Sequence, residues 1–343
     1  MILLRLIAVA AVFLLGAARA GEQPPARPGV LDEVRKRGYV SCGIAGDSPG
    51  FSQHDDKGEW SGFDVDFCRA LAAAVFDDPS RARFTVLPAK ERLSTLEAGW
   101  VDLLAGGVAW TEARDTSRGL LYVAVSFHDG QGFMTRAQKS VASAKELADR
   151  SICVQEGTVY ELDLAEYFGA RDAAVKPQLF PTFEAAAKAY DAGQCEALTA
   201  DLSLLHALRT KLSGPSEHAI LPDMVAKAPR GPIVRQGDDQ WFSLVRWTLF
   251  AMIEAEELGV SAVNVDRMLK SESSNIRRLL GVDGEFGGGL GLPANWAYRI
   301  VRHVGNYGDL FERNLGRGSP YAMERRLNAL WSNGGLMFAP AVR

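Results

Sequence analysis

The stretch GGVAWTEARDTSRGLLYVAVSFHDGQGFMTR, residues 106–136, decides how the rest of this chain is interpreted. It contains a short polar turn with Thr111 and Arg114, directly after an apolar run that ends at Val108. A guanidinium presents a rigid fork of N–H donors that suits a carboxylate, and a neighbouring hydroxyl can add one more donor. Taken alone, Thr-x-x-Arg more often marks a helix cap followed by a solvated Arg. The turn is therefore a candidate carboxylate site whose weight depends on the remaining sequence.

The first twenty residues have the pattern of a secretory signal peptide. Arg5 provides a basic start, an unbroken apolar run follows, and Ala18-Arg19-Ala20 forms an A-x-A cleavage site. The apolar run is shorter than a membrane span requires, which argues against an anchor. We therefore expect cleavage after Ala20 and export of the mature protein.

Length and charge limit the classes of function. A chain of 343 residues with 47% hydrophobic and 23% charged residues is typical of a soluble globular protein with two domains. Cleavage would remove Arg5 and Arg19, which leaves 36 basic against 42 acidic residues and a net charge of about −6. The sequence has no basic stripe of the kind that binds a phosphate backbone. Nucleic acid is therefore not expected as a partner.

Four cysteines occur in this exported chain, where disulfides can persist: Cys42, Cys68, Cys153 and Cys195. Four cysteines allow three connectivities. If the first third and the middle of the chain are separate lobes, only the sequential pairing, Cys42–Cys68 and Cys153–Cys195, keeps each bridge within one lobe. Metal ligation is the alternative, but no C-x-x-C or H-x-x-x-H spacing occurs and the five histidines are scattered. We expect neither a metal nor a cofactor.

Strand and helix patterns alternate in the first part of the chain and then restart. In the first part we expect strands over 39–44, 84–87 and 101–108, and helices over 31–37, 90–97 and from Asp64, whose carboxylate is placed to cap its helix. The alternation resumes with strands over 151–155, 178–180 and 197–200 and with helices that start near 158, 182 and 201. This order predicts an α/β protein of two lobes, mainly parallel sheets and a cleft between the lobes.

The joining segments and the C-terminal part complete the predicted organisation. We expect the chain to cross between the lobes near 132–136 and 231–236. After Asp238 the pattern is mostly helical, with an amphipathic helix over 322–330 in a tail that packs back on the first lobe.

The order of several sequence pieces resembles the periplasmic amino-acid-binding proteins of ABC importers (solute-binding protein family 3), and in particular the general L-amino-acid-binding subgroup. The resemblance covers nearly the whole mature chain. The pieces that carry it are GEWSGFDVDFCRALAAAVF (58–76), AKERLSTLEAGWVDLL (89–104), WTEARDT (110–116), DGQGFM (129–134), ICVQEGT (152–158), YDAGQC (190–195), RQGDDQW (235–241) and VGNYGDLFERNLG (304–316).

The resemblance implies a type II periplasmic-binding fold, in which two α/β lobes joined by a two-stranded hinge close over a ligand. On this basis residues 1–20 are the signal peptide, 29–134 the first part of lobe 1, 135–232 lobe 2, and 233–343 the return to lobe 1 with a helical C-terminal extension. A monomer that delivers its ligand to an inner-membrane ABC permease from the periplasm is also implied. The role of the segment after Gly316 is not implied.

The resemblance also implies the roles of five residues in the cleft. Arg114 would bind the α-carboxylate of an amino acid, with Thr111 in the same turn, and the N–H groups of Gly157 and Thr158 at a helix start would bind the same carboxylate. Asp201 would pair with the α-ammonium group, although an Asp after a strand can also simply cap the next helix.

Two positions depart from the family pattern. Ala109 stands where a Ser or Thr commonly adds a hydroxyl to the carboxylate pocket, and Val159 stands where a second Thr commonly points at the ligand. Each lost hydrogen bond to a charged group is worth about 1.5–3 kcal/mol, so binding is either weakened or directed to a different anionic group. The hypotheses left open are an amino-acid receptor, an exported enzyme on the same fold such as a dehydratase, and a degenerate sensor that binds another small carboxylate. The receptor is favoured because the cleft motifs contain no evident general base other than Asp201.

Overall fold

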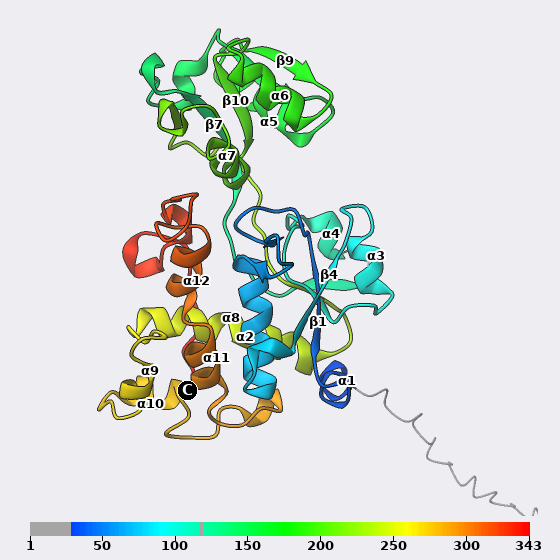
Figure 1. The fold of residues 1–343 in the computed structure, drawn as a ribbon, viewed down its shortest axis with the longest axis vertical. Helices are drawn as coiled ribbons and strands as arrows, with labels where there is room; N and C mark the ends of the chain where they lie inside the picture. The colour runs from blue at the N-terminus through cyan, green and yellow to red at the C-terminus, as the bar shows by residue number, and fades with distance from the viewer. Residues whose placement is uncertain (1–28, 117–118) are drawn as a thin grey trace, which may run out of the picture.

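The computed structural model describes residues 29–116 and 119–343, so the predicted signal peptide lies outside the described residues. Figure 1 shows two lobes, a smaller one around β7 and β10 and a larger one that contains both the start and the end of the described chain. Two chain segments connect them. The type II periplasmic-binding fold and its α/β class are as the sequence predicts.

The first lobe is built on a five-stranded sheet in the order β4-β1-β5-β13-β6. β1 runs parallel to β4 and β5, whereas β13 is antiparallel to β5 and β6. Its strands are β1 (Val40–Ile44), β4 (Ala82–Val86), β5 (Leu103–Leu104), β6 (Leu120–Tyr122) and β13 (Ile233–Arg235), and a separate hairpin joins β2 (Gln53–His54) to β3 (Trp60–Ser61).

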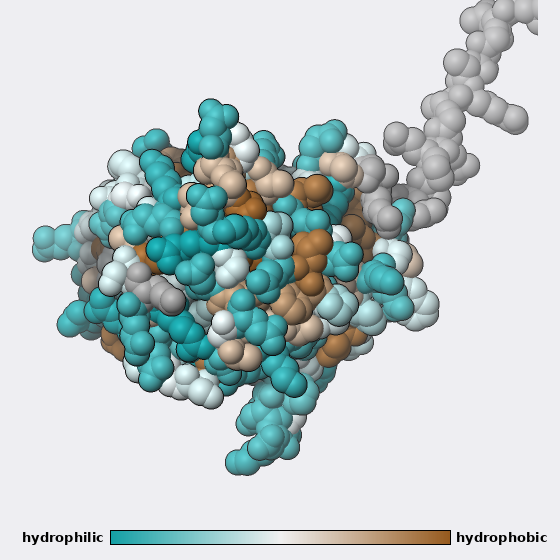
Figure 2. All heavy atoms as spheres, turned by 90° about the horizontal axis from the view of Figure 1, so that it is seen from above, coloured by the Kyte–Doolittle hydropathy of each residue, from teal (hydrophilic) through white to brown (hydrophobic). Residues whose placement is uncertain are grey.

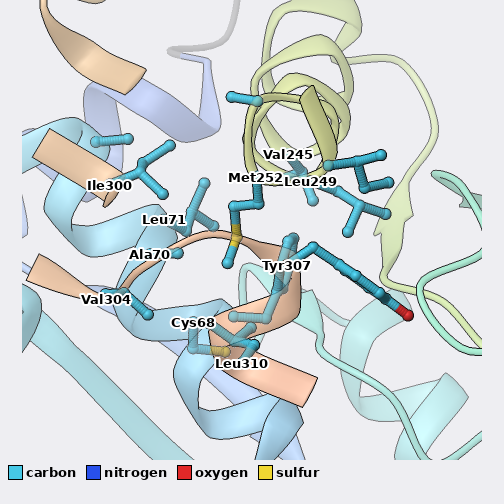
Figure 3. Close-up of a cluster of buried hydrophobic side chains, with 14 of the residues drawn as sticks. Cys68, Ala70, Leu71, Val245, Leu249, Met252, Ile300, Val304, Tyr307 and Leu310 are labelled. Carbon is cyan, nitrogen blue, oxygen red and sulfur yellow. The ribbon is translucent and has the colours of Figure 1, made fainter. Parts of the chain in front are cut away.

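Helices from both ends of the chain form the core of this lobe. The helices are α1 (Val30–Arg37), α2 (Phe63–Phe76), α3 (Arg92–Glu97), α4 (Glu112–Thr116), α8 (Asp239–Glu257), α9 (Val265–Met268), α10 (Ser274–Leu279), α11 (Trp296–His303) and α12 (Tyr307–Asn314). Figure 3 shows Leu71, Met252 and Ile300, from α2, α8 and α11, in one buried cluster. The hydroxyl of Tyr307 in α12 donates to the Ser126 carbonyl oxygen at 2.9 Å, which joins this core to the segment that leaves the lobe.

The second lobe has a sheet in the order β11-β7-β10-β8-β9, with β12 paired to β7. β8 runs parallel to both β9 and β10, whereas β7 is antiparallel to β10, β11 and β12. The strands are β7 (Gly130–Arg136), β8 (Ser151–Gln155), β9 (Lys176–Phe180), β10 (Ala197–Asp201), β11 (His218–Ile220) and β12 (Ala226–Lys227), and the helices are α5 (Val159–Gly169), α6 (Phe183–Asp191) and α7 (Leu202–Arg209). Both sheets are thus mixed, not mainly parallel as expected.

The two connecting segments, 123–129 and 228–232, are hydrogen-bonded to each other. Arg230 N donates to Phe127 O at 2.9 Å and Ala228 N donates to Asp129 O at 2.8 Å. The expected crossover positions are therefore wrong by a few residues, because 132–136 lies in β7 and 233–235 in β13. Glycines beside these segments allow close backbone packing, since a Cβ on Gly130 would lie 2.1 Å from the Ala226 carbonyl oxygen and one on Gly231 would lie 1.9 Å from that of Ala124.

The predicted cysteine pairing is confirmed. Cys42 pairs with Cys68 in the first lobe, and Cys153 pairs with Cys195 in the second. Each bridge stays within one lobe, as the two-lobe organisation requires.

Three local predictions are wrong. The apolar run 101–108 forms only the two-residue strand β5. Asp64 does not cap α2, whose N-cap residue is Gly62, and its side chain is buried instead. No helix forms over 322–330, where the structure has only a 3₁₀ turn, Arg326–Asn328, because the apolar residues of this tail pack individually into the first lobe.

The C-terminal tail packs on the first lobe as expected and also contacts the second. Met337, Ala339 and Val342 are buried in the first-lobe core. The Tyr321 carbonyl oxygen accepts a hydrogen bond from Arg209 of α7 at 3.3 Å. The tail therefore contacts both lobes beside the connecting segments.

The face of the molecule at the β7 and β10 end is mostly hydrophilic. Figure 2, which views the molecule from the end that carries β7 and β10, shows apolar side chains only in small separate groups on that face. Within residues 29–116 and 119–343, no helix has both the length and the apolar character needed to cross a membrane.

Candidate functional site

A pocket of about 440 Å³ lies between the two lobes. Its lining comes from the segments after β1, β4 and β5 in the first lobe, with the start of α3 and with α4, from the end of β10 and from α7 in the second, and from the connecting segment 228–232. The residues are Ala45, Asp47, Ser48, Pro49, Ala89, Arg92, Leu93, Gly107, Val108, Ala109, Arg114, Asp201, Leu204 and Arg230. A volume of this order is common for pockets that bind small molecules.

Arg114 lies on the first-lobe side of this pocket, in the short helix α4. Its Nη1 donates to the Ala109 carbonyl oxygen at 2.8 Å, and the side chain is otherwise exposed. The backbone N–H of Arg114 lies 3.4 Å from the Thr111 hydroxyl oxygen, so Thr111 acts as a helix cap and does not line the pocket. The turn combines both interpretations of its sequence: the Thr caps and the Arg faces the pocket.

Asp201 lies on the second-lobe side, at the end of β10 and the N-cap position of α7. Its side chain makes no capping hydrogen bond. Instead, its Oδ2 lies 2.9 Å from Arg230 Nη2. Burial raises the pKa of Asp201, the nearby Asp129 raises it further, and Arg230 opposes both. The Asp201 carboxylate is thus ion-paired with Arg230 and does not cap α7.

Arg230 is a pocket residue that the sequence analysis did not identify. Its guanidinium forms ion pairs with Asp129 at 2.7 Å and Asp201 at 2.9 Å, and it lies over the ring of Phe51 at 5.2 Å. Only 15% of its side chain is exposed. A single Arg between Pro229 and Gly231 gives no periodic or motif signal, so only the fold brings it to its partners.

Gly157 and Thr158 lie on the second lobe, where Thr158 is the N-cap residue of α5, but they do not line the pocket in this arrangement of the lobes. The Gly157 N–H donates to Glu161 Oε2 at 3.0 Å, and the Thr158 hydroxyl donates to the Gln155 carbonyl oxygen at 2.7 Å. Val159, next to them, is 64% exposed. The structure therefore brings together Arg114 and Asp201, but not Thr111, Gly157 or Thr158.

Two further charged groups lie at the first-lobe side. Arg92 donates to the Leu87 carbonyl oxygen at 3.0 Å and to the Gly107 carbonyl oxygen at 2.7 Å, which fixes its guanidinium at the pocket wall. Asp64 is buried, and burial raises its pKa to about 7 although Arg230 and Arg92 oppose the shift. The residues 29–116 and 119–343 hold no cluster of three His, Cys, Asp or Glu side chains that could bind a metal ion.

Comparison with protein families matches residues 40–260 to the bacterial extracellular solute-binding proteins, family 3. The chain belongs to this family. The chain is 46% identical to the general L-amino acid-binding periplasmic protein of Rhizobium johnstonii over 97% of both chains. It is 39% identical to the glutamate/glutamine/aspartate/asparagine-binding protein of Rhodobacter capsulatus, over 97% of this chain and 96% of the other.

A solved structure agrees with this family. A periplasmic binding protein of an ABC transporter from Brucella ovis, with glutathione bound, is 46% identical and superposes with a TM-score of 0.82 over 92% of this chain and 100% of the other. As a family member, this protein is an extracellular solute-binding protein and not an enzyme. The predicted dehydratase alternative is therefore not supported.

Proposed function

We propose that this protein captures an L-amino acid in the pocket between its lobes and delivers it to an ABC permease of the inner membrane. It acts as a monomer in the periplasm after removal of its signal peptide behind Ala20. Lobe 1 consists of residues 29–122 and 233–343 and lobe 2 of residues 130–227, so the boundaries expected at 134 and 232 move to the two connecting segments 123–129 and 228–232. The relatives named above, which are amino-acid-binding or ABC-transporter proteins of similar length, support this proposal.

The observation that carries the proposal is the placement of Arg114 and Asp201 on opposite sides of one pocket. A guanidinium on one lobe and a carboxylate on the other match the carboxylate and the ammonium group of a zwitterion. Each lobe therefore supplies one of the two charges that an α-amino acid needs. A ligand bound to both charges stabilises an arrangement in which the lobes are close together.

The remaining predicted ligand groups join the site only when the lobes close. Gly157 and Thr158 would then bring their N–H groups, at the positive end of α5, to the carboxylate held by Arg114. Thr111 supports the same site by capping the turn that carries Arg114. Rigid-body rotation about the segments 123–129 and 228–232 is the motion that this requires.

Arg92 favours a ligand whose side chain accepts hydrogen bonds. Its guanidinium is already oriented by two carbonyl oxygens, so little further ordering is needed when it binds a side-chain carboxylate or amide. Ala109 contributes its carbonyl oxygen, which accepts from Arg114, in place of a hydroxyl side chain. Together with the relative named for glutamate, glutamine, aspartate and asparagine, this makes these four the amino acids of first choice.

A thermal-shift screen tests this function. The mature protein, stripped of ligand by unfolding and refolding, is heated with each common L-amino acid and with carboxylates that lack an amino group. A ligand present at 100 times its Kd stabilises the folded state by about 2.7 kcal/mol, so even weak ligands are detected when in excess. Shifts with several L-amino acids, strongest for the four named above, are expected. No shift with any amino acid, together with a response to another acid, would favour the degenerate-sensor hypothesis.

A further inference from the structure

Two carboxylates at the pocket share one cation. Arg230 Nη2 lies 2.7 Å from Asp129 Oδ2 and 2.9 Å from Asp201 Oδ2. Asp129 is fully enclosed, with 0% of its side chain exposed, and Asp201 is 17% exposed at the pocket wall. Two ionised carboxylates and one guanidinium leave one negative charge on the cluster.

The two carboxylates differ in the number of protein groups that donate hydrogen bonds to them. Asp129 accepts from Gly130 N at 3.0 Å, from Ser203 N at 3.2 Å and from the Ser203 hydroxyl at 2.5 Å, in addition to Arg230. Asp201 accepts from Arg230 and lines the pocket. Protein donors occupy the acceptor sites of the Asp129 carboxylate, whereas the Asp201 carboxylate has acceptor sites left for a ligand.

Backbone hydrogen bonds and an aromatic ring fix the position of Arg230. Its backbone N–H donates to Phe127 O at 2.9 Å, its carbonyl oxygen accepts from Ser126 N at 2.9 Å, and its guanidinium lies over Phe51. Burial acts against its charge, but Asp129, Asp201, Asp64 and Tyr160 together raise its pKa. The guanidinium is thus a permanent charge at a fixed point of the connecting segment.

We propose that Arg230 is the positioning residue of the ammonium subsite: by balancing Asp129 it leaves Asp201 ionised, with the single negative charge that a ligand's ammonium group neutralises. This inference rests on the proposed function and names its chemical requirement. The cluster is one positive charge short, and a ligand with an ammonium group supplies that charge. A ligand without one, such as a 2-oxo acid, leaves a buried charge unbalanced when the lobes close.

Without Arg230, two close carboxylates would share a proton, because like charges in a buried site raise each other's pKa. Asp201 would then lose its ionised form at a higher pH. Asp64 and Arg92 of the first lobe also act on this region, and because Arg230 lowers the pKa of Asp64, removing the guanidinium raises the pKa of Asp64 as well. The double variant below also lacks this guanidinium, so its comparison with Arg230→Met separates the effect of Asp129 from that of Asp64.

Isothermal calorimetry between pH 4.5 and 8 tests the proposal with L-glutamate and its analogue 2-oxoglutarate as probes. The variants are Arg230→Met, Arg230→Lys, and the double variant Arg230→Met with Asp129→Asn, which restores a net charge of −1. Arg235→Met is the matched control, because Arg235 donates to the carbonyl oxygens of Leu96 and Val101 and does not line the pocket.

In the unaltered protein, glutamate binding is expected to weaken only in the acidic part of the range. In Arg230→Met, the pH at which half of the glutamate affinity is lost rises by about one pH unit or more. The reason is that an opposite charge close by lowers a carboxylate's pKa by about 1–3 units, and the variant removes that charge. The preference for glutamate over 2-oxoglutarate falls about tenfold or more at pH 6, following the same shift. Arg230→Lys and the double variant return both values toward those of the unaltered protein, and Arg235→Met does not change them.

A merely structural role of Arg230 gives a different result. Affinity would then fall by the same factor at every pH, with the midpoint and the preference unchanged, and this would overturn the inference. Absence of glutamate binding by the unaltered protein, together with silence from all L-amino acids in the thermal-shift screen, would overturn the proposed function itself. The two failures are therefore distinguishable.

Discussion

Arg114 Nη1 and the carbonyl oxygen of Ala109 lie 2.8 Å apart across the turn that follows β5. The same carbonyl oxygen accepts from the Tyr122 hydroxyl at 2.8 Å. Among the described residues, the bond to Ala109 is the one hydrogen bond that the Arg114 guanidinium makes. A guanidinium has five N–H donors. The side chain is thus oriented at the pocket wall with most of its donor fork available to an anion.

Substitution of Arg114 by Ala is expected to remove ligand binding without unfolding the protein. Loss of a charged anchor of this kind costs about 2–5 kcal/mol of binding free energy, or about 30-fold to several thousandfold in Kd. Because the side chain is exposed, the free energy of unfolding should change by less than about 0.5 kcal/mol. Calorimetry and chemical denaturation measure the two quantities.

Arg267→Ala serves as the control, since Arg267 is an exposed residue of the first lobe outside the pocket. It should change neither quantity. Retained affinity of the Arg114 variant at unchanged stability would show that the carboxylate anchor has been misassigned.

Glu161→Gln is expected to tighten ligand binding. In the present arrangement Glu161 Oε2 accepts from the Gly157 N–H at 3.0 Å, the same N–H that the proposed function assigns to the ligand carboxylate. A neutral amide oxygen can still accept from this N–H but more weakly than a carboxylate, by about 1 kcal/mol, so Kd should fall by about two- to tenfold. Calorimetry with L-glutamate measures the change.

The matched control is Glu166→Gln, on the same helix, where Glu166 is exposed and Glu161 is half-buried. If both variants change Kd equally, the effect is one of overall charge and not of competition for Gly157. Weaker binding by the Glu161 variant would contradict the assignment of that N–H to the ligand.

Asp64→Asn is expected to change how stability depends on pH. Burial raises the pKa of Asp64 from 3.8 to about 7, so between these values the folded state holds a proton that the unfolded state has released. The contribution of this group is therefore favourable below about pH 4 and is lost as pH rises toward 7. A shift of about three units corresponds to roughly 4 kcal/mol at pH 8.

Asn resembles the protonated carboxyl group and does not ionise, so the variant should be more stable than the unaltered protein at pH 8 and similar to it at pH 4. Denaturant titrations at both pH values measure this, with the exposed Asp32→Asn as control. A variant that is less stable at pH 8 would mean that the ionised form of Asp64 is stabilised by its surroundings, Arg92 and Arg230 included.

Sequence patterns correctly predicted the helices and strands whose local pattern matches their packing in the fold. β8 has the bounds that its apolar run indicated, and the helices α5, α6 and α7 begin within a residue or two of the expected positions. The run 101–108 misled because only Leu103 and Leu104 pair in the sheet, after which the chain turns away at Gly106. A Cβ there would lie 2.4 Å from Asp64 Oδ2, a contact that no local pattern reveals.

The site was predictable in part for the same reason. Arg114 and Asp201 stand in short motifs, so their positions beside a pocket could be expected from the resemblance to a family. Arg230 belongs to no such motif, and its partner Asp129 lies on the other connecting segment, far earlier in the chain. Its role depends on the pairing of two segments, which is a property of the fold.

Asn328→Ala is expected to destabilise the protein by detaching the C-terminal tail from a connecting segment. The buried side chain of Asn328 accepts from His128 N at 2.7 Å and donates to His128 O at 3.1 Å. Alanine leaves both backbone groups of His128 without these partners. Unsatisfied buried groups cost about 1–3 kcal/mol, so the free energy of unfolding should fall by this amount in denaturant titrations.

Asn333→Ala in the same tail is the control, because Asn333 is exposed and its side chain makes no hydrogen bond in the described structure. It should change stability by less than about 0.5 kcal/mol. Equal, small effects of both substitutions would mean that water replaces Asn328 at His128 and that the tail is not anchored there. A large effect of Asn328→Ala alone would establish that residues beyond the family match at 40–260 stabilise the connection between the lobes.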